Sequence, residues 1–208
     1  DPLHILKRII RERKVPADKV LSDTALKGVK TREDPMVASM RMVKDDWEVA
    51  QIRKACSITD AGARVLKREL LVPGARERKV AADLDSVLRH RSGVQLNSFE
   101  TIVASGAHAA YSHHDPATRR IGKNDTVICD FGVYFNGYVS DLTRTYSTGT
   151  PTKLMREVHE LVLRAQRDAI DRVEVGMPYS EIDSGIRDMF RSAGYHRHFV
   201  HGTGHGIG

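Results

Sequence analysis

Apolar residues recur at helical spacing over much of the first ninety residues. We expect a helix over residues 2–13, followed by a loop-rich stretch up to residue 44. Asp45 then resembles a helix N-cap, because Glu48 stands three residues later, where it can complete a capping box. A long amphipathic helix is predicted from this cap to about Leu70.

After Asn97 the sequence changes to runs that are typical of β-strands: SFETIVAS, TVICDFGVY and GYVSDLTRTYS. The dipeptide Asn136-Gly137 separates the last two runs and is the strongest short-range hairpin signal. Three more helices are expected, over residues 77–90, between 151 and 176, and over 181–193. The spacing of Ser180 and Asp183 indicates the start of the last of these helices.

The predicted hairpin carries two aspartates whose alignment can be worked out. With a two-residue loop, Asp130 lies opposite Thr143, and Asp141 lies opposite Gly132. Opposite residues share a face, as do residues two apart along a strand, so all four point the same way. The carboxylates become diagonal neighbours with Cα atoms on the order of 7–8 Å apart, and Gly132 leaves open space beside them.

Two facing carboxylates suit a pair of bridged cations, which lie about 3.5–4 Å apart in two-metal sites. The alternative is a half-exposed hairpin whose solvent face carries two aspartates by chance. Against it, Asp130 follows the apolar run Thr126–Cys129, and aspartate is a poor strand residue unless something compensates its charge. The pattern therefore favours a metal site.

Composition narrows the class of protein. Of 208 residues, 40% are hydrophobic and 29% charged, as in an ordinary globular protein, and no run approaches the roughly 18 apolar residues of a membrane span. The net charge is +6, but basic and acidic residues are interspersed, which favours a solvated surface over nucleic-acid binding. The two cysteines, Cys56 and Cys129, are far apart, so we expect a reducing, cytoplasmic setting.

Histidines gather in two places, at His113-His114 and between residues 196 and 205. His201 and His205 stand four apart in the glycine-rich frame HGTGH, where the backbone can approach a ligand closely. Imidazole is the commonest metal ligand and a proton shuttle near neutral pH. Structural and functional roles both stay open for these histidines on spacing alone.

Three separated segments, SGAHAAYSHHDPATRRIGKNDTVICDFG, NGYVSDLTRTYSTG and HFVHGTGHGIG, together resemble the metallopeptidases of the pita-bread fold. The form of the motifs is most similar to the Xaa-Pro aminopeptidase and Xaa-Pro dipeptidase (prolidase) branch. The resemblance implies an α+β fold with an antiparallel sheet covered by helices. It also implies that residues 1–40 are the tail of an N-terminal domain or a linker, and that 41–208 form a catalytic domain lacking its C-terminal part.

The resemblance implies two divalent metal ions, with Mn²⁺, Co²⁺ and Zn²⁺ all suitable. Carried over by position, Asp130 would chelate one metal, Asp141 would bridge both, and His205 would bind the other. The family's site has five protein ligands, and the last two are glutamates beyond the HG-x-GH motif. No glutamate follows His205. We therefore expect the 208 residues to be a piece of a longer protein, with an incomplete site.

Further roles also follow only from the resemblance. His113 would hydrogen-bond substrate near the scissile bond, His201 would line the substrate site, and Thr143 would hold a ligand carboxylate. The implied activity is hydrolysis of Xaa-Pro bonds in peptides with proline at the second position, at the N-terminus or in dipeptides. Methionine aminopeptidase-like activity and a non-catalytic binding protein on the same fold are the alternatives. No membrane partner is expected, and a homodimer is among the oligomeric states left open.

Overall fold

The computed structural model describes the chain except residues 1, 17–18, 23–31, 34–35, 93 and 95. It divides into two compact units, Asp1–Val49 and Ala50–Gly208. The domain boundary expected after residue 40 stays a prediction. None of the described helices is both long and apolar enough to cross a membrane.

In the first unit, helix α1 (Pro2–Glu12) confirms the helix expected over residues 2–13. Strands β1 (Leu21–Ser22) and β2 (Arg32–Glu33) pair in parallel. The loop expected up to residue 44 is wrong at α2 (Met36–Met42), where the run MVASMRM is helical with no buried residue. Methionine, alanine and arginine favour a helix locally.

Helix α3 (Asp46–Val65) starts at the expected capping box. The backbone N–H of Asp45 donates to Glu48 Oε2 at 2.7 Å, and the N–H of Glu48 donates to Asp45 Oδ1 at 2.8 Å. A π-helical turn, η2 (Leu66–Leu70), completes the helical segment where the periodicity predicts its end.

Six strands form two three-stranded antiparallel sheets, in the orders β4-β5-β8 and β3-β6-β7. The second β-type run is divided into β5 and β6, and the third into β7 and β8. Of SFETIVAS, only the last four residues are a strand. The bounds are β3 (Leu96–Asn97), β4 (Ile102–Ser105), β5 (Thr126–Phe131), β6 (Val133–Phe135), β7 (Tyr138–Val139) and β8 (Leu142–Ser147).

The register of the hairpin is the one predicted from its turn. Asp130 pairs with Thr143 in the β5–β8 ladder, and Phe135 pairs with Tyr138 beside the loop. Asn136 and Gly137 have φ angles of 48° and 89°, so both occupy the left-handed region that a type I′ turn requires. The two-residue loop therefore fixes which side chains share a face.

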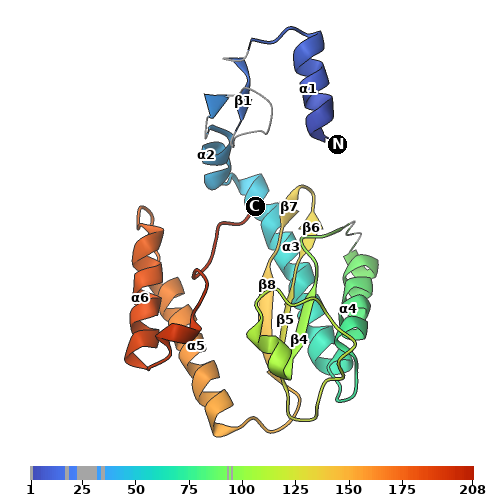
Figure 1. Ribbon diagram of the computed structural model, residues 1–208, viewed down its shortest axis with the longest axis vertical. Helices are drawn as coiled ribbons and strands as arrows, with labels where there is room; N and C mark the ends of the chain where they lie inside the picture. Colours follow the sequence, from blue (N-terminus) through green and yellow to red (C-terminus); the bar gives the residue numbers. More distant parts are fainter. Residues whose placement is uncertain (1, 17–18, 23–31, 34–35, 93, 95) are drawn as a thin grey trace. The chain divides into compact units, whose positions relative to one another are not determined.

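Alternate residues of β5 are buried, among them Val127, Cys129 and Phe131. They pack with residues of α3 and α4 (Glu77–Ser92) in the main hydrophobic cluster, so both helices cover one face of the strand (Figure 1). The intervening residues, including Asp130, lie on the other face. This alternation places the carboxylate away from the core helices.

Gly132 marks the break between β5 and β6. A Cβ atom there would lie 2.0 Å from the Ser140 carbonyl oxygen and 2.2 Å from Ser98 Oγ. The interpretation that Gly132 leaves open space beside the carboxylates is therefore wrong. Its missing side chain instead allows the close approach of the opposite strand and of Ser98, whose hydroxyl donates to the Ser140 carbonyl at 2.9 Å.

We expect Gly132→Ala to lower the free energy of unfolding by about 2 kcal/mol or more, because the obstructing atom belongs to the backbone and cannot rotate away. Gly185→Ala is the matched control, since its Cβ would meet only the mobile end of Arg172 at 3.2 Å. In a helix that change should be neutral or stabilising by roughly 0.5–1 kcal/mol. Urea unfolding of both variants tests the expectation, and equal stabilities would contradict it.

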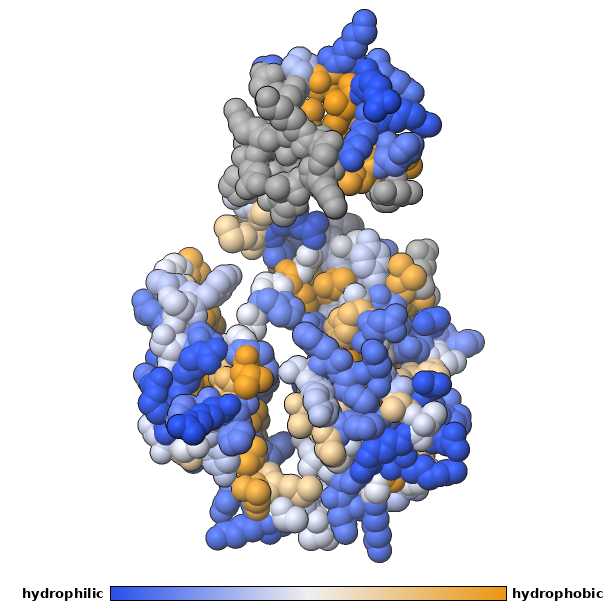
Figure 2. All heavy atoms as spheres, viewed as in Figure 1, coloured by the Kyte–Doolittle hydropathy of each residue, from blue (hydrophilic) through white to orange (hydrophobic). Residues whose placement is uncertain are grey.

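Helices α5 (Lys153–Arg172) and α6 (Tyr179–Ser192) pack together around a second hydrophobic cluster. Helix α6 confirms the helix expected over residues 181–193, but it begins at Tyr179 with Pro178 at the N-cap, so the capping pattern expected at Ser180 is wrong. The Asp183 side chain therefore takes no part in a cap with Ser180 and can bind other groups. Hydrophilic residues cover much of the face seen in Figure 2, with hydrophobic residues in smaller patches.

Candidate metal centre

Asp130 is half-buried on the hairpin face that points away from the core. A hydrogen bond from the Thr143 side chain stabilises its carboxylate. The other oxygen, Oδ1, is buried and has no hydrogen-bond partner. A buried polar atom without a partner costs about 1–3 kcal/mol, so this oxygen fits a role as a ligand of a cation.

The charges around Asp130 favour the same interpretation. Burial raises the pKa of its carboxyl group, the Thr143 hydrogen bond lowers it, and the negative charge of Asp141 raises it again. His113 and His205 are close enough to lower it electrostatically. The net rise in pKa means that the ionised carboxylate lacks sufficient positive charge nearby, which a bound metal ion would supply.

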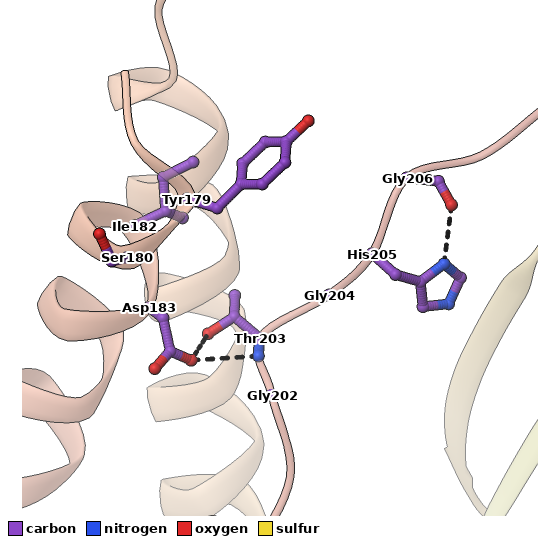
Figure 3. Close-up of a pocket in the computed structure, with 9 residues that line it drawn as sticks. All are labelled: Tyr179, Ser180, Ile182, Asp183, Gly202, Thr203, Gly204, His205 and Gly206. Atoms are coloured by element: carbon purple, nitrogen blue, oxygen red, sulfur yellow. Dashed lines mark hydrogen bonds between the residues drawn. The ribbon is translucent and has the colours of Figure 1, made fainter. Parts of the chain in front are cut away.

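His205 approaches the second carboxylate of the hairpin. Its Nε2 lies 3.3 Å from Asp141 Oδ2, while its Nδ1 lies 2.9 Å from the Gly206 carbonyl oxygen (Figure 3). A neutral ring that donates Nδ1–H to this carbonyl presents the Nε2 lone pair to Asp141. Two atoms that face each other with lone pairs repel unless a proton or a metal ion lies between them. Histidines that donate one ring N–H to a backbone carbonyl are typical metal ligands through the other ring nitrogen.

The glycine-rich segment that carries His205 is tied to α6 through Asp183. Asp183 Oδ1 accepts hydrogen bonds from Thr203 Oγ1 at 2.7 Å and from Thr203 N at 3.2 Å (Figure 3). Arg187 Nε donates to the other oxygen at 2.6 Å. Hydrogen bonds from Arg187 and Thr203 lower the pKa of Asp183. An open pocket lies between this end of α6 and residues 202–206.

Asp183→Ala should release Thr203 and loosen the segment that aims His205. We expect the affinity for the proposed metal to fall by about tenfold, as is typical when the support of a ligand is removed. Titration of the full-length protein with Mn²⁺ measures this, and Asp168→Ala, which removes a carboxylate bonded to Arg172 on α5, is the control. Unchanged affinity in Asp183→Ala would contradict the anchoring role.

The remaining histidines of the prediction lie in different places. His113 is exposed in the loop after β4 and acts electrostatically on Asp130. His201 packs its ring edge-on against Phe199, with centroids 4.9 Å apart, and its carbonyl accepts from Arg187 at 2.9 Å. The structure thus gathers Asp130, Asp141, Thr143, His113 and His205, whereas His201 contacts Phe199 and Arg187 beside α6.

The three proposed ligands do not form a closed cluster. Among the described residues, the one group of three whose ligand atoms all lie within 4.8 Å of one another is Glu77, His108 and His114. The sequence interpretation missed this group because Glu77 lies 31 residues before His108 and has no local spacing to link them. Three histidines between residues 108 and 114 were the available signal.

The antiparallel hairpin, its facing carboxylates and the imidazole aimed at one of them define an α+β protein with a candidate metal centre. The chain belongs to metallopeptidase family M24, whose family model matches residues 50–208. That match includes every residue proposed for the centre.

Individual relatives place the chain within this family. It is 37% identical to the Xaa-Pro dipeptidase of Pyrococcus furiosus over 175 residues, which cover 84% of this chain and 50% of the relative. The solved prolidase of Pyrococcus furiosus matches with a TM-score of 0.82 and 35% identity, over 88% of this chain and 55% of that one. The X-Pro aminopeptidase of Thermotoga maritima matches with a TM-score of 0.83 and 29% identity, over 99% and 61%.

These likenesses confirm the predicted pita-bread α+β fold and the resemblance to the Xaa-Pro branch. The chain spans about half the length of the curated relatives it matches.

Proposed function

We propose that the full-length protein is a metal-dependent exopeptidase that hydrolyses Xaa-Pro bonds, at peptide N-termini or in dipeptides. The observation that carries this proposal is the partnerless, buried Oδ1 of Asp130, whose carboxyl group lies close enough to Asp141 to feel its charge. Membership of family M24 and the similarity to Xaa-Pro dipeptidases support the reaction class.

In this proposal Asp130, Asp141 and His205 hold two divalent cations. Mn²⁺, Co²⁺ and Zn²⁺ are all suitable, because carboxylates with one imidazole do not choose sharply among them. Bound cations of this kind polarise a carbonyl group and lower the pKa of a water molecule.

Other residues of the chain act on the substrate and on the ligands. Thr143 keeps the Asp130 carboxylate in one orientation through its hydrogen bond. His113 has the exposure needed to reach a peptide and to donate a hydrogen bond near the scissile bond. His201 lines the substrate side of the glycine-rich segment.

The proposed substrates are peptides with proline at the second position, and the proposed location is the cytoplasm. Cys56 and Cys129 are both free thiols in the structure, which agrees with a reducing compartment. Burial raises the pKa of Cys129 to about 12, so that thiol stays protonated and unreactive. A homodimer stays among the oligomeric states left open, and nucleic acid is not a proposed partner.

Hydrolysis assays on the full-length protein test the activity. With Mn²⁺ or Co²⁺ we expect cleavage of an Xaa-Pro dipeptide or of a longer peptide with an N-terminal Xaa-Pro, and loss of cleavage with a chelator. Which of the two substrates is cleaved separates dipeptidase from aminopeptidase. Activity that survives the chelator would overturn the metal dependence.

Two rivals are distinguished by the same assays. Preferential cleavage of peptides that begin with methionine and lack proline would indicate a methionine aminopeptidase-like enzyme. Absence of all peptidase activity, together with nucleic-acid binding that persists in Asp141→Ala, would indicate a non-catalytic binding protein.

A further inference from the structure

Glu77, the first residue of α4, is a completely buried carboxylate outside the proposed centre. Its Oε1 accepts hydrogen bonds from Ser105 N at 2.7 Å and from Ser105 Oγ at 2.6 Å. Its Oε2 faces two imidazoles, with His108 Nδ1 at 2.9 Å and His114 Nε2 at 3.0 Å. Ala117 N completes the surroundings of Oε2 at 3.2 Å. His108 Nδ1 also lies 3.1 Å from Oε1, so each oxygen is held by a backbone N–H group, and Oε2 in addition meets two metal-binding groups.

The spacing of these groups is close to that of a metal's ligand set. All three ligand atoms lie within 4.8 Å of one another. Ligands bound at about 2.0–2.1 Å in a tetrahedral site are roughly 3.3 Å apart, only slightly more than the nitrogen–oxygen distances observed. The His108 and His114 rings lie 4.2 Å apart between centroids and are tilted by 38°, so both present a nitrogen to the same oxygen.

From this arrangement we propose that Glu77, His108 and His114 form a second metal site, which binds one divalent transition-metal ion of the Zn²⁺ or Co²⁺ kind. Two imidazoles and one carboxylate are a common ligand set for such ions, and three protein ligands leave a position for water. The argument for this site does not rest on the proposed peptidase activity.

The surroundings of the cluster favour a cation. Ser105 N, Ser105 Oγ and Ala117 N all donate hydrogen bonds to the Glu77 carboxylate and hold it beside the two imidazoles. The side chains of His108 and His114 are 31% and 14% exposed, which gives an ion a route from solvent.

The cationic side chain of Arg119 does not occupy the position of the ion. Its Nη1 donates to Ser105 Oγ at 2.9 Å and to Asp125 Oδ2 at 2.7 Å. Asp125 therefore neutralises this guanidinium, and Ser105 separates it from Glu77. Glu77 keeps its negative charge for the two imidazoles.

The cluster is separate from the hairpin carboxylates. Ser105, which binds Glu77, pairs with Val127 in the β4–β5 ladder, whereas Ile102 pairs with Asp130. Three residues along a strand correspond to roughly 10 Å. An ion bound by His114 would also fix the loop that carries the neighbouring His113, so the site would order the loop beside the proposed substrate.

Zinc counting in the full-length protein tests the site. Asp130→Ala/Asp141→Ala disables the hairpin centre, and after dialysis against Zn²⁺ this variant should retain roughly one Zn²⁺ per chain at the cluster. Adding His108→Ala or His114→Ala should remove it. Adding His90→Ala is the matched control, because this exposed histidine of α4 bonds to Ser86 on its own helix. Equal zinc content in all these variants would overturn the proposal.

Thermal unfolding provides a second readout that does not depend on the His108→Ala and His114→Ala variants staying folded. His108→Asn keeps a side-chain N–H that can bond Glu77 but removes the imidazole ligand. Zn²⁺ should raise the melting temperature of the Asp130→Ala/Asp141→Ala protein and have a much smaller effect once His108→Asn is added. If the cluster is only a hydrogen-bonded support, Zn²⁺ will raise neither melting temperature, and the proposal fails.

Discussion

Asp141→Asn is expected to lower kcat/KM of the full-length protein for an Xaa-Pro substrate by more than about 100-fold. Mutating a residue that only supports a metal ligand costs up to about 100-fold in activity, so the loss of a ligand itself should cost more. Asparagine keeps the size of the side chain but removes the charge that faces both Asp130 and His205. The bound Mn²⁺ per chain should fall in parallel. Asp168→Asn, which changes an exposed carboxylate on α5, is the matched control and should keep full activity.

The same variant separates loss of the metal from loss of the fold. The charge of Asp141 raises the pKa of Asp130, so removing it relieves an unfavourable interaction in the metal-free protein. With a chelator present, Asp141→Asn should be at least as stable to heat as the unmodified protein. An inactive variant that is also much less stable would not support a ligand role, and an active one would contradict it.

Glu77→Gln is expected to lower the free energy of unfolding by about 3–5 kcal/mol, measured with a chelator so that metal binding does not contribute. The amide removes a buried charge from five hydrogen-bond donors and turns an N–H₂ group toward some of them. Glu157→Gln is the control, because Glu157 is exposed and lies 3.7 Å from Lys153. Denaturant unfolding should find that control within about 0.5 kcal/mol of the unmodified protein.

A pH dependence with a defined sign accompanies this change. The pKa of Glu77 falls from 4.5 to about 2 on folding, so its stabilisation is complete above pH 4.5 and is lost as the pH falls toward 2. The unmodified protein should therefore lose more unfolding free energy over this range than Glu77→Gln. Parallel losses in the two proteins would contradict the role given to Glu77.

Local chemistry made much of the fold predictable. Asn136-Gly137 admits a type I′ turn, and that turn fixed the pairing of Asp130 with Thr143. The Asp45–Glu48 capping box formed as expected, because it depends only on residues three apart. Structural features that depend only on residues close together in the sequence could thus be predicted.

Features set by distant segments were not predictable. The break at Gly132 arises because the Ser140 carbonyl and Ser98 come close to it, and neither approach is encoded nearby. The Glu77 cluster joins the start of α4 to a loop more than 30 residues later. Pattern and spacing therefore identified the hairpin carboxylates, whereas the second histidine–carboxylate cluster required the tertiary structure.

The most direct test of the central claim is anomalous diffraction from crystals of the full-length protein grown with Mn²⁺ or Co²⁺. The proposed centre predicts anomalous peaks within about 2.0–2.3 Å of oxygens of Asp130 and Asp141, one of them also close to His205 Nε2. Crystals of an active, metal-loaded protein with no anomalous peak at these carboxylates would contradict it.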